Sequence, residues 1–264
     1  MNAWRSGEVE VSSGRLAYHR TGGDGPPLVL SHGLTDNGLC WSRFARAMEP
    51  DYDVIMLDAR GHGESCGVTG AAPHEPGRDI AEAIDALDLV SPLLMGHSVG
   101  ALATAACAGA KPGRISKVVL EDPPLGPLAD AAAADGRRRR FRQQVERFRS
   151  LTETEIIAMG KARSPGWHDE EFPSWAAAKR QVDPDAMPVS DTPWQDSIAR
   201  IRVPTLLIYG EAELGGLVTP TAAAQAVALN PNIRTARITG AGHNVRRENF
   251  PDFLSAVRAF LADP

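Results

Sequence analysis

The sequence is poor in cysteine. Its three cysteines, Cys40, Cys66 and Cys107, are odd in number, far apart in the chain and without C-x-x-C spacing. A disulfide framework usually has an even set of cysteines, and a zinc site of the finger type needs close cysteine pairs. We therefore expect neither, and a reducing cytoplasm is the simplest location.

Long apolar runs and basic excess are also missing. Nowhere do the roughly 18 consecutive apolar residues of a membrane-spanning helix occur. The N-terminal stretch MNAWRSGEVEV has no apolar core of a secretory signal. A formal net charge of −5 gives no general attraction to a phosphate backbone. These absences predict a soluble cytoplasmic protein with no membrane and no nucleic acid as partner.

Common metal and cofactor motifs are absent as well. The sequence contains no H-E-x-x-H, no G-x-x-x-x-G-K and no G-x-G-x-x-G that opens a helix. The histidines in SHG and GHG are better explained as residues of turns than as metal ligands. We expect no metal and no nucleotide cofactor.

Short β-rich runs alternate with helical stretches along most of the chain. After an antiparallel pair near the N-terminus, the pattern predicts strands at 28–33, 53–61, 92–98 and 116–124, with helices at 39–48, 77–88 and 98–110. Apolar runs that end in glycine or polar residues are typical of buried parallel strands. The fold class is therefore α/β, with a mostly parallel sheet flanked by helices.

The alternation stops after Asp122 and returns near residue 203. The intervening residues contain no convincing strand but several helical segments, among them one with a Thr152–Glu155 capping box and one with Ser174 as a plausible N-cap. Strands at 203–209 and 233–238 and helices at 220–229 and 250–261 follow. We predict a core of residues 1–123 and 203–264, interrupted by a helical cap of residues 124–202.

Four consecutive arginines, at 137–140, lie in the predicted cap. Phe141, Val145 and Phe148 follow them at i, i+4 and i+7. This spacing predicts a helix with one apolar stripe and a solvated basic face, rather than a nucleic-acid site.

The segment LLMGHSVGAL contains the clearest catalytic candidate. Ser98 stands between two glycines in the G-x-S-x-G pattern, which places a serine on a sharp strand-to-helix turn. A serine hydroxyl is a weak nucleophile and needs a neighbouring base. His243, in the glycine-rich TGAGHNV directly after the last predicted strand, is the candidate base. His97 is expected to point into the flank of the sheet.

A serine nucleophile also needs donors for the oxyanion of a tetrahedral intermediate. In LSHGLTDNG, Gly33 lets the backbone turn so that the amide of Leu34 faces the site. The amide of Val99, directly after the nucleophile, is the second candidate donor.

These motifs together resemble the α/β-hydrolase superfamily. HGLTDNG, DARGHGES, GHSVG and GAGH occur in the superfamily's order over nearly the whole chain. The resemblance implies an α/β-hydrolase fold with a mostly parallel eight-stranded sheet, a helical cap after strand six, and a catalytic triad in the order serine, acid, histidine.

The triad acid is where the sequence departs from the commonest pattern of this superfamily. Glu213 lies at the usual distance of the acid after Gly210, which ends the seventh strand. Counted back from Pro220, however, the usual acid position falls on a glycine. Asp122, in VVLEDPP at the end of the sixth strand, resembles the acid that some members use. We favour Asp122 over Glu213; Glu121 is less favoured, because strand alternation should turn it away.

The leading functional hypothesis is a cofactor-free serine hydrolase. It would cleave an ester or lactone of a small to medium apolar molecule through an acyl-enzyme, with Trp167, Trp175 and Trp194 of the cap as candidate substrate-binding residues. Hydrolysis of a carbon–carbon bond by the same triad is the alternative, and a ligand sensor without turnover is the rival from another class. A monomer or a homodimer is expected.

Overall fold

The computed structural model describes residues 4–68, 74–127, 130–187 and 192–263. Its strands are β1 (Arg5–Val11), β2 (Gly14–Arg20), β3 (Pro27–Ser31), β4 (Asp53–Leu57), β5 (Leu93–His97), β6 (Lys117–Glu121), β7 (Thr205–Tyr209) and β8 (Ile233–Arg237). They form one sheet in the order β1-β2-β4-β3-β5-β6-β7-β8. Strands β3 to β8 are parallel, and β2 pairs antiparallel with both β1 and β4. The predicted α/β-hydrolase fold with eight mostly parallel strands is confirmed.

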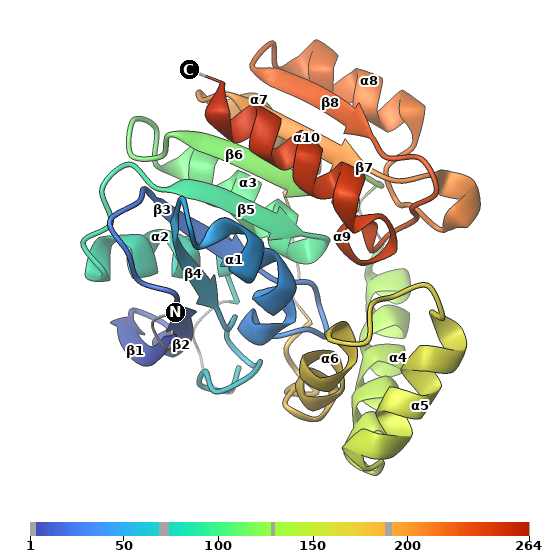
Figure 1. Ribbon diagram of the computed structural model, residues 1–264. Coiled ribbons are helices and arrows are strands. Elements are labelled where there is room, and N and C mark those ends of the chain that lie inside the picture. Colours follow the sequence, from blue (N-terminus) through green and yellow to red (C-terminus); the bar gives the residue numbers. More distant parts are fainter. Residues whose placement is uncertain (1–3, 69–73, 128–129, 188–191, 264) are drawn as a thin grey trace.

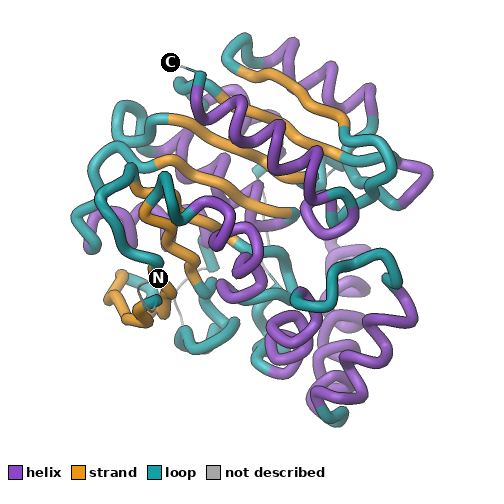
Figure 2. The backbone as a smooth tube through the Cα atoms, viewed as in Figure 1, coloured by secondary structure: helices purple, strands orange, loops and turns teal. Residues whose placement is uncertain are grey.

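Helices cover both faces of this sheet (Figures 1 and 2). The α-helices are α1 (Ser42–Met48), α2 (Pro76–Ala86), α3 (Val99–Ala110), α4 (Ala131–Arg149), α5 (Glu153–Arg163), α6 (Glu171–Arg180), α7 (Trp194–Arg200), α8 (Pro220–Leu229), α9 (Val245–Glu248) and α10 (Phe250–Ala262), and the short 3-10 helices are η1 (Gly38–Trp41) and η2 (Ala212–Leu214). Helices α1 and α10 pack on one face, and α2, α3, α7 and α8 pack on the other.

Strand alternation divides the core into two apolar clusters. In β3, Leu28 and Leu30 point to the face covered by α1 and α10, whereas Val29 points to the face covered by α3. Successive side chains of a strand point to opposite faces, so a strand covered on both faces is apolar throughout. This explains why the buried strands are continuous apolar runs in the sequence.

The helices between β6 and β7 differ in what they contact. Helices α4, α5 and α6 pack on one another and extend beyond the sheet (Figure 1). Helix α7, which we predicted as the end of the cap, packs against α3 and α8, and its Trp194 and Ile198 belong to the apolar core. The division into core and cap stays a prediction, but the contacts of α7 place that helix with the sheet.

Local predictions in this segment have mixed outcomes. The capping box is confirmed, because the side chain of Thr152 accepts from the amide of Glu155 while the Glu155 carboxylate accepts from the amide of Thr152. The prediction that Ser174 caps a helix is wrong. Helix α6 begins at Glu171, because the chain already turns helical there, so Ser174 lies within it.

No described helix combines the length and the apolar surface that a bilayer crossing demands.

Candidate active site

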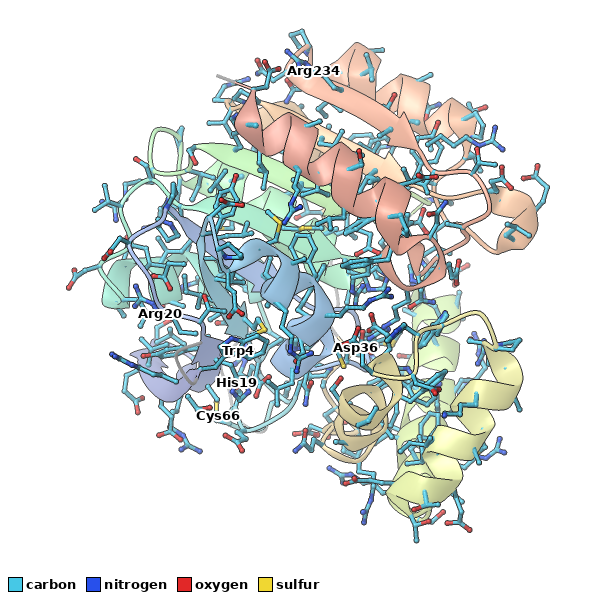
Figure 3. All side chains as sticks on the ribbon, in the orientation of Figure 1. Trp4, His19, Arg20, Asp36, Cys66 and Arg234 are labelled. Carbon is cyan, nitrogen blue, oxygen red and sulfur yellow. The ribbon has the colours of Figure 1, made fainter. Side chains whose placement is uncertain are left out.

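Ser98 occupies a strained turn between β5 and α3. Its backbone has φ 56° and ψ −124°, a conformation that L-residues other than glycine rarely adopt. Its amide donates to the carbonyl of Glu121 on the neighbouring strand (2.9 Å), which fixes the turn. The turn is the geometry expected of a nucleophile elbow, and it places Ser98 directly after the C-terminal end of β5 (Figure 3 draws all described side chains on the ribbon).

The two glycines around the elbow are required by close backbone approach. A Cβ on Gly96 would lie 2.3 Å from the carbonyl oxygen of Gly100, and a Cβ on Gly100 would lie 2.3 Å from the carbonyl oxygen of His32. Both obstacles are backbone atoms, so no side chain can move aside. The G-x-S-x-G spacing is thus a packing requirement of the turn.

Asp122 and His243 meet at the same edge of the sheet. Nδ1 of His243 donates to Oδ2 of Asp122 at 2.7 Å. The Asp122 side chain is fully buried, whereas 28% of the His243 side chain is exposed. The amides of Leu217 (2.8 Å) and Val218 (3.0 Å) also donate to the Asp122 carboxylate. Three N–H groups therefore converge on the Asp122 side chain, and its contact with Nδ1 orients the imidazole while Nε2 of His243 lies outside this contact.

Glu213, the competing acid, lies elsewhere. It is exposed on η2, whereas Asp122 accepts the hydrogen bond from Nδ1 of His243. Glu121 is buried and forms an ion pair with Arg246 (3.0 Å) instead of the contact with Nδ1 of His243 that Asp122 makes. Of the three acids considered, the structure brings Asp122 to the histidine.

The chain that carries the candidate oxyanion donor passes beside the elbow. A Cβ on Gly33 would lie 3.5 Å from Cβ of Ser98, so the next residue, Leu34, is close to the nucleophile. The Leu34 carbonyl accepts a hydrogen bond from Nε2 of His62 (2.5 Å), which fixes this peptide. Val99 is the first residue of α3, and an amide at that position has no acceptor within its own helix.

A buried ion network surrounds this edge of the sheet, and sequence reasoning missed it. Its members are three carboxylates and three cations: Asp36, Glu121, Glu171, Lys179, Arg246 and Arg247. Each of these side chains is at most 5% exposed. Burial alone would raise the pKa of Asp36, but Arg247, Lys179 and Arg246 hold it well below its ordinary value. The network joins loops of the catalytic edge to α6.

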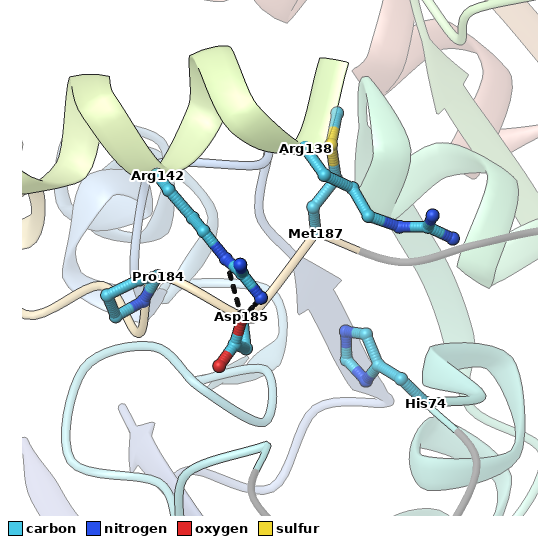
Figure 4. A pocket seen from close by; sticks show the side chains of 6 residues that line it. All are labelled: His74, Arg138, Arg142, Pro184, Asp185 and Met187. Carbon is cyan, nitrogen blue, oxygen red and sulfur yellow. Dashed lines mark hydrogen bonds and ion pairs between the residues drawn. The ribbon is translucent and has the colours of Figure 1, made fainter. Parts of the chain in front are cut away.

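A basic cavity of about 250 Å³ lies between α4 and the chain before α7 (Figure 4). Arg138 and Arg142, one helical turn apart, line it together with His74, Asp185 and Met187. Nε of Arg142 donates to Asp185 (2.9 Å), and burial followed by the charge of Arg60 lowers the pKa of His74 to about 4. Arg138 pairs with Asp135 (2.7 Å), so each guanidinium at the cavity has one carboxylate partner, and His74 adds no charge at neutral pH.

An apolar cluster connects the lining of this cavity with the candidate oxyanion segment. Met187 packs against an apolar cluster of Phe141, Val145, Val182 and Ala186, and Leu34 packs against the same cluster. The arginine-rich helix α4 thus has an apolar stripe and a solvated basic face, as predicted, and two residues of that face, Arg138 and Arg142, also line the cavity.

The three candidate substrate-binding tryptophans have different surroundings. Trp194 is 6% exposed in the apolar core, so its location does not support contact with a substrate. Trp167 and Trp175 pack edge to face, with ring centroids 6.0 Å apart, against Phe172. A substrate contact of either ring stays a prediction.

Metal binding finds no support in the described ranges. No group of three or more histidine, cysteine, aspartate or glutamate side chains there is arranged to hold an ion.

Comparison with known proteins identifies the family of this chain. Residues 28–257 match the alpha/beta hydrolase family. The chain is 30% identical to the N-formylmaleamate deformylase of Pseudomonas putida, over 98% of this chain and 97% of that protein. It is 26% identical to the 2-(acetamidomethylene)succinate hydrolase of Mesorhizobium japonicum, over 95% of this chain and 94% of that protein.

Solved structures show the same fold. The crystal structure of E-2-(acetamidomethylene)succinate hydrolase has a TM-score of 0.82 at 22% identity and covers 99% of this chain and 100% of that chain. The chain belongs to the alpha/beta hydrolase family, and the two relatives named above are hydrolases.

Proposed function

We propose that this protein is a cofactor-free serine hydrolase that cleaves an acyl bond through an acyl-enzyme, with Ser98, His243 and Asp122 as its triad. The observation that carries the proposal is the hydrogen bond between His243 and the buried Asp122, in a chain whose Ser98 occupies a strained elbow at the same sheet edge. An ester or lactone is the bond predicted from the sequence.

The reaction follows from the roles of these groups. Oγ of Ser98 attacks the carbonyl carbon as Nε2 of His243 takes its proton. The amides of Leu34 and Val99 stabilise the oxyanion, and Asp122 stabilises the imidazolium without taking the proton. The imidazolium then protonates the leaving group. Water, activated by His243, releases the acyl group and regenerates the serine.

A second candidate bond is the N-acyl amide. Two relatives aligned over nearly their whole length are named for action on N-formylmaleamate and on 2-(acetamidomethylene)succinate, both small carboxylates that carry an N-acyl group. Arg138 and Arg142, each with one carboxylate partner of its own, bring two guanidinium groups to the cavity, and their remaining N–H groups suit a substrate carboxylate. We therefore extend the proposed substrates to small carboxylates with an ester, lactone or N-acyl bond.

The first experiment tests the nucleophile without knowledge of the substrate. The purified protein is treated with a fluorophosphonate, and the adduct is located by mass spectrometry, with Ser98→Ala and His243→Ala as controls. Stoichiometric labelling at Ser98 that is lost in both variants is expected. A folded protein that is not labelled, yet binds a small molecule tightly, would be a ligand sensor instead.

The second experiment separates the bonds and the charge preference. Matched esters, lactones and N-acyl compounds are assayed with and without a free carboxylate. Arg138→Ala and Arg142→Ala should raise KM for the carboxylate compounds about tenfold and leave the neutral ones unchanged, since a charged hydrogen bond contributes about 1.5–3 kcal/mol. Arg139→Ala, on the exposed side of α4, is the matched control. Equal effects on neutral and charged substrates would contradict the carboxylate assignment.

A further inference from the structure

The histidine loop of the candidate triad is held at two points by the residues that precede the other two triad members. Nε2 of His97 donates to the carbonyl of His243 (3.1 Å). Oε1 of Glu121 accepts from the amide of Arg246 (2.9 Å), and Oε2 pairs with the Arg246 guanidinium (3.0 Å). One anchor lies on His243 itself and the other lies three residues later, at the start of α9.

The two anchors are neighbours on the sheet. His97 of β5 and Glu121 of β6 are register partners in the parallel ladder, so their side chains point to the same face. Ser98 and Asp122 follow them directly. The sheet register that spaces the nucleophile and the acid therefore also spaces the two groups that hold the base.

Both anchors have surroundings that define their hydrogen bonds. Burial, followed by the charges of Arg246 and His243, lowers the pKa of His97 well below its ordinary value, so the ring is neutral and its single proton is on Nε2. The His97 and His243 rings pack with centroids 4.8 Å apart. Arg246 lies over the Trp41 ring at 4.1 Å and is 2% exposed, so its backbone has little freedom.

Stability alone does not account for the Glu121–Arg246 pair. Burying two charges costs several kcal/mol per ion in desolvation, and well-packed apolar residues often replace such pairs without loss. The pair does something that apolar residues cannot do, because its carboxylate also holds a backbone amide of the histidine loop.

We propose that His97 and Glu121 are positioning residues that together fix the His243 loop, and thereby aim Nε2 of His243 at Ser98. This inference rests on the proposed triad. Displacing a catalytic group by about 1 Å can cost 10²-fold in rate, so loosening the loop should lower the rate of the chemical step and spare substrate binding.

The main test variant removes the pair without leaving a buried unpaired charge. In Glu121→Met/Arg246→Met, Asp36 keeps Lys179 (3.0 Å) and Arg247 (3.0 Å) as partners, and Glu171 keeps Arg247 (3.3 Å) and Arg43 (3.9 Å), so every remaining charge has a partner. The matched control is Arg20→Met/Asp53→Leu, which removes an ion pair at the opposite end of the parallel strands.

Three measurements are made on each folded variant: the rate constant of fluorophosphonate labelling, kcat and KM for the best substrate, and the downfield NMR resonance of the His243 Nδ1 proton. We expect labelling and kcat to fall ten- to hundredfold, KM to stay within twofold, and the resonance to shift or broaden. The control pair should label within twofold of wild type and keep the resonance unchanged.

A second pair of variants keeps the test decisive if the double variant does not fold. His97→Leu removes the neutral donor, and His97→Gln retains an N–H donor, so the first should lose at least tenfold in labelling and the second should lose less. A folded double variant, or a folded His97→Leu, that labels within twofold of wild type with an unchanged resonance would overturn the inference.

The NMR readout separates this failure from failure of the proposed function. If wild type is not labelled but the resonance moves in the variants, the hydrolase proposal fails and the positioning role stands. If wild type is labelled and neither labelling nor resonance changes in the variants, the positioning role fails alone.

Discussion

The candidate triad acid is tested most sharply by removing its charge without changing its volume. In the structure, Oδ2 of Asp122 accepts from Nδ1 of His243 and from the amide of Leu217, while Oδ1 accepts from the amide of Val218. The side chain introduced by Asp122→Asn has only one acceptor oxygen, so its NH₂ group must face either Nδ1 of His243 and the Leu217 amide or the Val218 amide.

Either orientation of the new amide impairs the base. With the NH₂ group toward His243, Nδ1 of the imidazole must accept, and Nε2 then carries the proton and cannot take one from Ser98. With the oxygen toward His243, the tautomer is kept but the charge that stabilises the imidazolium is lost. A serine protease with the equivalent change loses about 10⁴-fold in kcat, or about 5 kcal/mol. We expect kcat/KM of Asp122→Asn to fall about 10³- to 10⁴-fold.

The assay compares kcat/KM and fluorophosphonate labelling of Asp122→Asn and Glu213→Gln with wild type. One facing pair of buried donors should cost about 1–3 kcal/mol of folding free energy, so thermal unfolding must show that the variant is folded at the assay temperature. Glu213 is exposed, and its variant should stay within twofold of wild type. A loss below tenfold in Asp122→Asn, or equal losses in both, would refute the assignment of Asp122.

Three further perturbations test the fold around the site. Gly100→Ala places a Cβ 2.3 Å from the His32 carbonyl oxygen and should lower the unfolding temperature sharply. In Gly136→Ala the Cβ meets only the side chains of Arg140 (3.4 Å) and Arg139 (3.9 Å), so the unfolding temperature should stay equal or rise. Calorimetry of both variants tests this difference. Asp36→Asn should reduce the free energy of unfolding most at neutral pH, because the folded state lowers the pKa of the Asp36 carboxyl group. Such a carboxylate stabilises the folded state above its unfolded pKa of about 3.9, and this contribution is lost as pH falls through the folded pKa. Urea unfolding at pH 7 and at about pH 3.5 should show this difference shrink at the lower pH, and a constant difference would contradict it. Trp194→Ala should cost about 3–5 kcal/mol of stability and leave KM within twofold, because the ring is buried in the apolar core; a raised KM in a stable variant would restore Trp194 as a substrate contact.

Most of the sheet was predictable because its strands are apolar runs that end in polar residues or glycine. Helix α9 was not, because it has only four residues and two of them are Arg246 and Arg247. Arginine is ordinarily a surface residue, yet these side chains are at most 2% exposed. Their partners Glu121 and Asp36 lie 125 and 211 residues away in the chain, so no local pattern indicates their burial.

The sequence predicted some residues of the candidate site fully and others only as alternatives. The glycine spacing around Ser98 reflects a close backbone contact, so the motif alone was enough to predict the turn. The acid was left between two candidates because distance from Gly210 favours Glu213. In the structure the chain after Gly210 forms η2 with Glu213 exposed, and the amides of Leu217 and Val218 then turn to Asp122. That turn depends on the fold around Asp122, which residue spacing does not encode.

Two of the four non-glycine residues with left-handed backbone in the described part of the chain are Ser98 (φ 56°) and Asp122 (φ 41°). Such conformations cost of order 1–3 kcal/mol each and persist only where the surroundings fix them. Both residues directly follow a strand. The amide of Ser98 donates to the Glu121 carbonyl, and the amide of Asp122 donates to the Ile208 carbonyl, each at 2.9 Å. The parallel ladder thus continues one residue past each strand, and the sheet's own hydrogen bonds hold the strained backbone that presents the two side chains.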